Sequence, residues 1–342
     1  MNQFDAQFVI ESPTGTDTGT GTGAALNTYY KAPMGSKGRS RGIVHINHGL
    51  AEHAARYATF ASVLSESGFH IYAHDHRGHG HTKVAGGDAP QGVFSLSGDG
   101  GNKNGMQKVL RDCAAVQDFA LARHSNGDGE KPLPVIMFGH SMGGLITMNY
   151  ALAHGDRLAG AAVWNANFDG GALGRLAQAI LKFERFRLGS DVPSRLLPKL
   201  TFEAWGAQIK NRRTAFDWLS HIEGQVDAYI ADPLCGWDAS VGMWLTIFEM
   251  VFAGGKLGID QATDAAKKLP FSFVGGGQDP ATNKGASVRA QAARLQAAGF
   301  SQVALTIFDK ARHETLNDHD AAAATALFDT FARACAKAHQ KA

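Results

Sequence analysis

The chain contains little cysteine, and the positions of its cysteines exclude two common uses of this residue. Only three of 342 residues are cysteines, at Cys113, Cys235 and Cys335, and none belongs to a CxxC pair. An odd, widely spaced set is neither a disulfide framework nor a zinc knuckle, and it favours a reducing compartment. The N-terminus also lacks a basic start followed by an apolar run, the pattern of a signal peptide. We therefore expect a cytoplasmic protein.

Surplus charge and long apolar runs are also missing. Lys and Arg number 33 against 31 Asp and Glu, a net charge of +2, and no long basic run occurs, so nothing indicates a nucleic-acid partner. No stretch of about 18 consecutive apolar residues is present, which excludes an obvious transmembrane helix. Hydrophobic residues nevertheless make up 44% of the chain, enough for a packed core in one large domain with an insertion.

Short apolar runs alternate with helical patterns along most of the chain. The runs resemble fully buried parallel strands and lie at Ile43–His48, Phe69–His74, Pro134–Phe138, Gly160–Trp164, Phe271–Val274 and Val303–Phe308. The helical patterns lie at Ala55–Ser67, Gly105–Ala122, Gly143–Ala153, Gly285–Ala298 and Ala321–Lys337. This alternation predicts an α/β fold with a mostly parallel central sheet flanked by helices.

The N-terminal segment predicts a hairpin. Its strands are Gln7–Ile10 and Ala25–Tyr30, joined by the Thr/Gly-rich stretch Thr14–Leu26. The GxGxG pattern in that stretch is not interpreted as a phosphate loop, because no strong strand precedes it and no Lys-Ser/Thr closes it.

One long segment, between Asn165 and Leu269, contains no good buried strand. Because it follows the carboxyl end of a strand, where α/β sheets bind ligands, we predict a helical cap rather than an extra layer of core helices. The predicted organisation is a first core part at 1–165, a cap at 166–268 and a second core part at 269–342. The cap would contain an apolar helix stripe and a strongly apolar helix, at Leu173, Leu176, Ala177, Ile180, Leu181 and Ser240–Phe252.

The stretch Gly139-His140-Ser141-Met142-Gly143 fits the pattern G-x-S-x-G. The pattern alone is weak, but here an apolar strand runs into it and a helical pattern leaves it, which is the context of a nucleophile turn. Such a turn strains the serine backbone and needs glycine on both sides. It also exposes the hydroxyl at a helix N-terminus, whose dipole favours negative charge. We predict that Ser141 is a nucleophile; the alternative is a Gly-rich turn with an incidental serine.

A serine nucleophile needs a histidine as base and a carboxylate as acid. In this kind of fold the acid follows the serine along the chain, and the histidine follows the acid. Asp279 lies in the Gly-rich loop after one predicted strand, and His313 lies in the loop after the next. We predict these two residues for the roles of acid and base. Asp309 and Asp318 remain as rivals for the acid, and a turn aspartate remains as the alternative role of Asp279.

Acyl transfer also needs two N–H donors for the developing oxyanion. One donor in this kind of fold is the residue after the nucleophile, here Met142. The other comes from the loop after an early strand, where His48-Gly49-Leu50 makes Leu50 the candidate.

Several ordered segments resemble one known family. HGLAEHAARY (His48–Tyr57), DHRGHGHT (Asp75–Thr82), GHSMGG, ARHETLND and the cap segment Phe216–Trp237 are similar to motifs of monoacylglycerol lipases and bacterial lysophospholipases. These form the serine aminopeptidase S33-like branch of the α/β-hydrolases. The resemblance implies the α/β-hydrolase fold, a triad of Ser141, Asp279 and His313, oxyanion donors at Leu50 and Met142, and a cap that admits one acyl chain. Ala51, where many members have Gly, is a departure.

The resemblance and the residues together predict a serine hydrolase that cleaves carboxylic esters without a cofactor or metal. The first expectation is a lysophospholipase or monoacylglycerol lipase type of enzyme, and the alternative is a carboxylesterase of short-chain or small esters. The cap supplies aromatic residues that would line an acyl channel or touch a membrane surface, and it is rich in basic residues. These two sets are Trp205, Phe216, Trp218, Trp237, Trp244, Phe248 and Phe252, and Arg175, Lys182, Arg185, Arg187, Lys210, Arg212 and Arg213. The sequence predicts no oligomeric state.

Two other classes of protein remain as alternatives. The run from His74 to His79 partly matches the H-x-H-x-D-H pattern of binuclear metallo-hydrolases, but Gly78 stands where a ligand aspartate belongs and no further ligands are evident. We instead expect Asp75 and Arg77 to pair with each other in a polar loop. A binding protein without catalysis is the second alternative.

Overall fold

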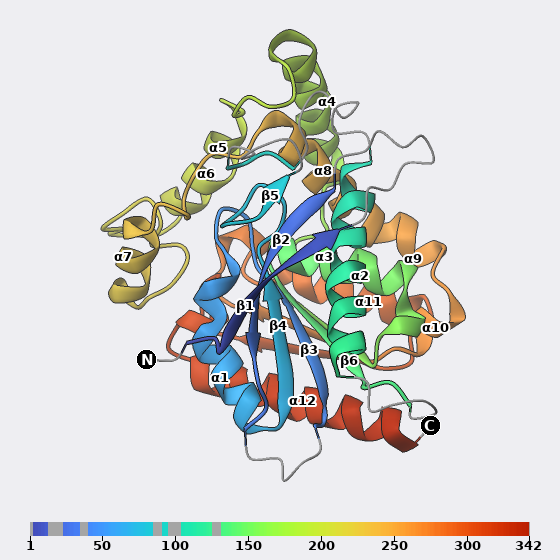
Figure 1. The fold of residues 1–342 in the computed structure, drawn as a ribbon. Coiled ribbons are helices and arrows are strands. Elements are labelled where there is room, and N and C mark those ends of the chain that lie inside the picture. The colour runs from blue at the N-terminus through green and yellow to red at the C-terminus, as the bar shows by residue number, and fades with distance from the viewer. Residues whose placement is uncertain are drawn as a thin grey trace.

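The computed structural model describes residues 3–12, 23–34, 40–84, 91–94, 104–124 and 131–341, without the side chain of Leu173. One sheet crosses the whole molecule, with strand order β1-β2-β4-β3-β6-β7-β8-β9 (Figure 1). Its strands are β1 (Ala6–Ser12), β2 (Ala24–Lys31), β3 (Gly42–Asn47), β4 (Phe69–His74), β6 (Val135–His140), β7 (Gly160–Trp164), β8 (Phe271–Gly276) and β9 (Val303–Phe308). The short β5 (Lys83–Val84) pairs with β2.

The sheet is mostly parallel, as the alternation of strands and helices predicts. Strands β4, β3, β6, β7, β8 and β9 pair in parallel, whereas β2 runs antiparallel to β1 and to β4. The predicted N-terminal hairpin is confirmed in its two strands, and most of the predicted turn between them, residues 13–22, lies outside the described part of the chain.

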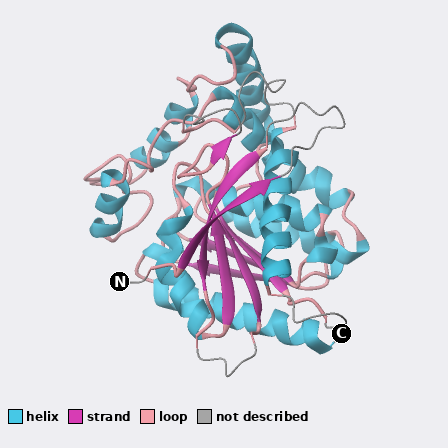
Figure 2. Ribbon diagram, in the orientation of Figure 1, coloured by secondary structure: helices cyan, strands magenta, loops and turns pink. Residues whose placement is uncertain are grey.

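Helices cover both faces of the sheet (Figure 2). Residues of α1 and α12 pack with Val44 and Ile46 of β3 on one face, and residues of α2, α3 and α11 pack with Ile43 on the other. Successive strand residues point to opposite faces, so one buried strand supplies both cores. These helices are α1 (Ala58–Glu66), α2 (Gly105–Arg123), α3 (Met142–Ala153), α11 (Ala286–Ala297) and α12 (Ala321–Lys341).

The segment between β7 and β8 consists of helices joined by loops, with one isolated β-bridge between Pro193 and Ser240. Figure 1 shows α4–α6 rising beyond the end of the sheet and α7 at the left of the view, whereas α9 and α10 lie beside the core helices. Helix α8 packs against α2, α3 and α4 and so joins the two groups. The predicted cap therefore contains helices of two kinds: α4 (Gly171–Leu188), α5 (Leu197–Leu200), α6 (Phe202–Ala207) and α7 (Glu223–Ala231), and then α8 (Val241–Phe252), α9 (Gly258–Asp260) and α10 (Asp264–Lys268).

Short 3-10 turns and one π-helical turn complete the described elements. They are η1 (Ala54–Tyr57), η3 (Gly155–Arg157), η4 (Ala253–Leu257), η5 (Pro280–Thr282) and η6 (Thr315–Asn317). In the described part of the chain, no helix combines the length and the apolar character that a membrane crossing requires.

Candidate active site

Ser141 stands in the sharp turn between β6 and α3. Its backbone has φ of 55° and ψ of −116°, a conformation that strains any residue with a side chain. A Cβ on Gly139 would collide with the carbonyl of Gly143, and a Cβ on Gly143 would collide with the carbonyl of Asn47. The two glycines therefore let the strand, the turn and the helix pack closely, and the turn places the Ser141 hydroxyl at the N-terminus of α3.

His313 joins the serine to an aspartate. Its Nε2 atom lies 2.9 Å from the Ser141 Oγ atom, and its Nδ1 atom lies 2.9 Å from the Asp279 Oδ2 atom. Asp279 and His313 come from the loops after β8 and β9, which are neighbouring strands. The structure thus brings the three predicted residues, far apart in the sequence, into one hydrogen-bonded chain.

Asp279 is fully buried and well supplied with donors. Its carboxylate also accepts hydrogen bonds from the Thr282 hydroxyl, the Asn165 side-chain amide and the Ala281 backbone amide. Burial alone would raise the pKa of Asp279, but His313, Thr282 and Asn165 lower the pKa below its usual value. The carboxylate is therefore ionised at neutral pH and can hold the His313 ring in one orientation.

The two rival aspartates lie elsewhere. Asp309 is exposed at the end of β9. Asp318 accepts hydrogen bonds from the His221 ring and the Arg312 backbone amide. Asp318 therefore ties the cap to the loop that carries His313 but is not bonded to that ring.

Leu50 and Met142, the two predicted oxyanion donors, line the same cavity as Ser141. Met142 is the first residue of α3, where backbone N–H groups have no partner within the helix. Leu50 belongs to the loop after β3, and the next residue, Ala51, has a positive φ of 55°. That left-handed conformation suits glycine, the residue expected from the family resemblance.

The cavity above Ser141 has a volume of about 650 Å³ and is mostly apolar. Such a volume lies within the range of roughly 300–1,000 Å³ typical of small-molecule sites. Four of the predicted cap aromatics line it, whereas Trp237 packs against His79 and Phe216 packs against Tyr229. The apolar cap residues at the cavity are Leu176, Ala177, Ile180, Leu196, Leu197, Leu200, Phe202, Trp205, Trp218, Leu219, Trp244, Ile247, Phe248 and Val251.

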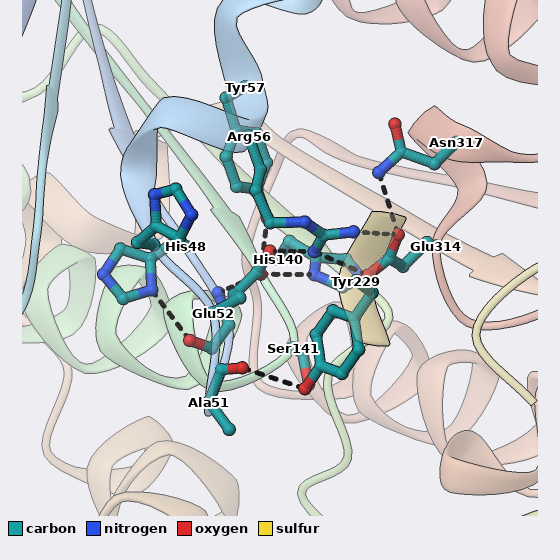
Figure 3. Close-up of polar contacts among 12 residues, drawn as sticks. His48, Ala51, Glu52, Arg56, Tyr57, His140, Ser141, Tyr229, Glu314 and Asn317 are labelled. Carbon is teal, nitrogen blue, oxygen red and sulfur yellow. Dashed lines mark hydrogen bonds and ion pairs between the residues drawn. The ribbon is translucent and has the colours of Figure 1, made fainter. Parts of the chain in front are cut away.

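A buried ionic network lies beside the serine (Figure 3). The Arg56 guanidinium donates to both Glu314 oxygens, at 2.8 and 2.9 Å, and also to Glu52. Glu52 in turn accepts from the Gly49 backbone amide and, at 2.9 Å, from the Tyr57 hydroxyl. The network thus connects the loop of Leu50 with the loop of His313.

His140 extends the network to the residue before the nucleophile. Its Nε2 atom lies 3.0 Å from the His313 backbone carbonyl, and its Nδ1 atom lies 3.5 Å from Glu52. Burial would lower the pKa of His140, but the Glu52 carboxylate raises it above its usual value. Burial would likewise raise the pKa of Glu52, but Arg56 holds it well below its usual range. Sequence reasoning did not find this network, although Glu52, Arg56 and Glu314 lie within the segments that resemble the family.

The expected ion pair between Asp75 and Arg77 is absent. Arg77 instead donates to both oxygens of Asp112 on α2, at 2.6 and 2.9 Å. Asp75 accepts from the Asn27 side chain and from the Ala54 and His81 backbone amides. The sequence could not show this partner, because α2 is a separate element some 35 residues further along the chain.

The histidine run does not gather metal ligands. Among the described residues, the single group of three potential ligands with converging atoms is His53, Asp232 and Cys235, which lies outside that run. His74, His76 and His79 are buried, together with His45 and His48.

Comparisons with known proteins show which family this chain resembles. A family model described as serine aminopeptidase, S33, matches residues 38–320. A monoacylglycerol lipase of Mycolicibacterium smegmatis is 35% identical over 111 residues, which are 32% of this chain and 32% of that protein. The human monoglyceride lipase is 24% identical over 202 residues, 58% of this chain and 53% of that protein. The chain spans between about a third and about half of the length of these curated relatives.

A solved structure resembles nearly the whole chain. The structure of a thermostable carboxyl esterase from Bacillus coagulans, in complex with glycerol, superposes with a TM-score of 0.78 and 23% identity. The superposition covers 97% of this chain and 98% of that one. At this identity the likeness shows the fold alone, which is the predicted α/β-hydrolase fold.

Proposed function

The chain belongs to the serine aminopeptidase S33 family of α/β-hydrolases, and from this premise we propose that it cleaves carboxylic esters through an acyl-enzyme on Ser141. The observation that carries the proposal is the hydrogen-bonded chain from Ser141 through His313 to Asp279, at one side of an apolar cavity. The lipase relatives support the ester class of substrate.

In the proposed mechanism, His313 takes the Ser141 proton as the serine oxygen attacks the ester carbonyl. The Leu50 and Met142 amides stabilise the oxyanion, and the helix dipole of α3 adds to that stabilisation. The His313 imidazolium, held by Asp279, then protonates the leaving alcohol. Water repeats the sequence on the acyl-enzyme and releases the acid. These steps use no metal or organic cofactor.

The cavity favours a substrate with one long acyl chain, such as a monoacylglycerol or a lysophospholipid. Its wall consists largely of leucine, isoleucine and tryptophan side chains from the cap, which offer a long chain apolar burial. A short acyl group would leave most of about 650 Å³ unfilled. The alternative, a carboxylesterase of short-chain esters, uses the same three residues.

A transient contact with a membrane surface fits the outer side of α4. Phe183 and Phe186 are 60% and 86% exposed there. Lys182, Arg185 and Arg187 stand among them on the same helix. Exposed aromatics flanked by basic residues are typical of surfaces that bind anionic lipid interfaces. We propose that this side of the cap contacts the membrane while the cavity takes up its substrate.

The test is an ester series. p-Nitrophenyl esters of increasing chain length are assayed first, and monoacylglycerol and lysophosphatidylcholine are then compared. We expect kcat/KM to rise from acetate to medium and long chains, and we expect Ser141→Ala to abolish turnover of all of them. Turnover confined to acetate and butyrate would overturn the lipid assignment but leave the serine mechanism intact. Undiminished turnover by the Ser141→Ala variant would overturn the mechanism itself.

A further inference from the structure

A second cluster of polar side chains lies where the cap meets the loop that carries Leu50. His53, Asp232 and Cys235 each offer one ligand atom, and these atoms lie within 4.8 Å of one another. His53 follows β3, whereas Asp232 and Cys235 follow α7 in the cap. All three side chains are at least half buried, so their polar atoms are largely withdrawn from water.

We propose that His53, Asp232 and Cys235 bind one zinc ion, at a site separate from the ester-cleaving residues. Imidazole, carboxylate and thiolate are the ligands that zinc takes in proteins, and three of them leave a fourth position for water. Bonds of about 2.0–2.3 Å in a tetrahedral arrangement separate neighbouring ligand atoms by roughly 3.5 Å. His53 Nε2 and Asp232 Oδ2 now lie 2.8 Å apart, so only a small widening of this pair is needed.

The charge around the cluster favours a divalent cation. Asp232 contributes a carboxylate at the cluster itself. The carboxylates of Glu52 and Glu314 lie nearby, and both interact electrostatically with Cys235. Arg56 pairs with Glu52 and Glu314, and His140 lies 3.5 Å from Glu52, so the carboxylate left to neutralise a cation is that of Asp232.

Cys235 supplies its ligand with loss of a proton. Zinc replaces that proton, which leaves for solvent as the zinc–sulfur bond forms, and the affinity therefore increases with pH. Asp232 is 30% exposed and gives the ion a path from solvent.

Bound zinc would strengthen an existing connection. The Tyr229 hydroxyl and the Gly236 backbone amide, both from the cap side, already donate to the Ala51 carbonyl at 2.8 and 3.0 Å; Figure 3 shows Tyr229 beside Ala51. The ion would add a link from the same part of the cap to His53. Because an ion that binds only the folded chain stabilises it, Tm should rise with the zinc concentration.

The experiment uses full-length protein, freed of tags and of metal by dialysis against EDTA. Zn²⁺ is titrated in competition with a chromophoric chelator, and Tm is recorded in parallel. We expect one ion per chain and a rise in Tm. Cys235→Ser and Asp232→Asn should each weaken binding more than about tenfold. Cys113→Ser, which changes a buried cysteine on α2, is the matched control and should bind zinc as the wild type does.

Co²⁺ reports the sulfur ligand directly. A thiolate-to-metal absorption band in the near ultraviolet is expected for the wild type and for Cys113→Ser, but not for Cys235→Ser. Absence of stoichiometric binding, or equal affinity in Cys235→Ser and wild type, would overturn the proposal. Because the readouts are metal content, Tm and absorption, failure here is distinguishable from failure of the proposed esterase activity.

Discussion

Lowering the pH from 8 to 5.5 should destabilise this protein sharply, because five histidines are buried without charge. His45, His48, His74, His76 and His79 are all buried near the loop that carries Leu50, and burial is the main cause that lowers the pKa of each. The pKa falls to about 3 for His45 and His79, and to about 4 for His48. At pH 5.5 these rings stay neutral in the folded chain.

The unfolded chain binds protons that the folded chain cannot bind. A histidine with a pKa of about 6.5 in the unfolded state takes up a proton as the pH falls, so the free energy of unfolding decreases below that pH. For one ring the decrease between pH 8 and pH 5.5 is about 1.4 kcal/mol, and for five rings about 7 kcal/mol. Typical domains have only about 5–15 kcal/mol of stability. His140 acts in the opposite sense, because its pKa is raised, and offsets part of this loss.

The assay is urea unfolding, followed by circular dichroism at several pH values between 8 and 5.5. His76→Met is the informative variant, because both ring nitrogens of His76 are buried without a partner among the described residues. It should reduce the loss of stability between pH 8 and 5.5 by about 1.4 kcal/mol. His81→Met, at an exposed position, is the control for the substitution itself.

A flat stability between pH 8 and 5.5 would refute this reasoning, since it would mean that the five rings accept protons in the folded chain. An unchanged pH dependence in His76→Met would refute the assignment to that ring.

Three further predictions concern the site. Asp279→Asn should lower kcat by about 10⁴ with little change in KM, because the amide cannot hold the needed His313 tautomer; equal kcat in variant and wild type contradicts this role. Glu52→Gln breaks a buried ion pair and should lower the free energy of unfolding by about 3 kcal/mol. Because the Gly49 amide then shifts, kcat should also fall about 10²-fold. An unfolding curve and kinetics like those of the wild type would exclude both effects. Gly143→Ala should yield little folded protein, because its Cβ would collide with the Asn47 carbonyl, whereas Gly224→Ala, where a Cβ meets open space, should fold normally; soluble expression and circular dichroism compare them.

Much of the core could be predicted from local patterns. The strands are short apolar runs because both faces of the sheet are covered. Each strand can therefore be recognised from its own residues, without knowledge of the strand that it pairs with. The turn at Ser141 can also be recognised from neighbouring residues. Its glycines are required because the strand and the helix approach each other closely there. The loops of Asp279 and His313 follow neighbouring strands, so their proximity follows from the sheet.

Contacts between elements that are far apart in the sequence were harder to predict. Arg77 has an acidic neighbour two residues away, yet the fold turns its side chain toward Asp112 on α2. Glu52 and Glu314 lie more than 250 residues apart and meet only because Arg56 stands between their loops. Helix α8 packs against the core helices α2 and α3. The sequence did not separate it from the helices above the cavity, because α8 and those helices all carry apolar residues.

The most direct test of the central claim is covalent labelling of the nucleophile. The wild type is incubated with a fluorophosphonate, and the modified residue is identified by mass spectrometry of peptides. We predict one label per chain, on Ser141, with labelling lost in Ser141→Ala and strongly slowed in His313→Ala. Stoichiometric label on another residue, or labelling of Ser141 at an equal rate without the His313 ring, would contradict the account.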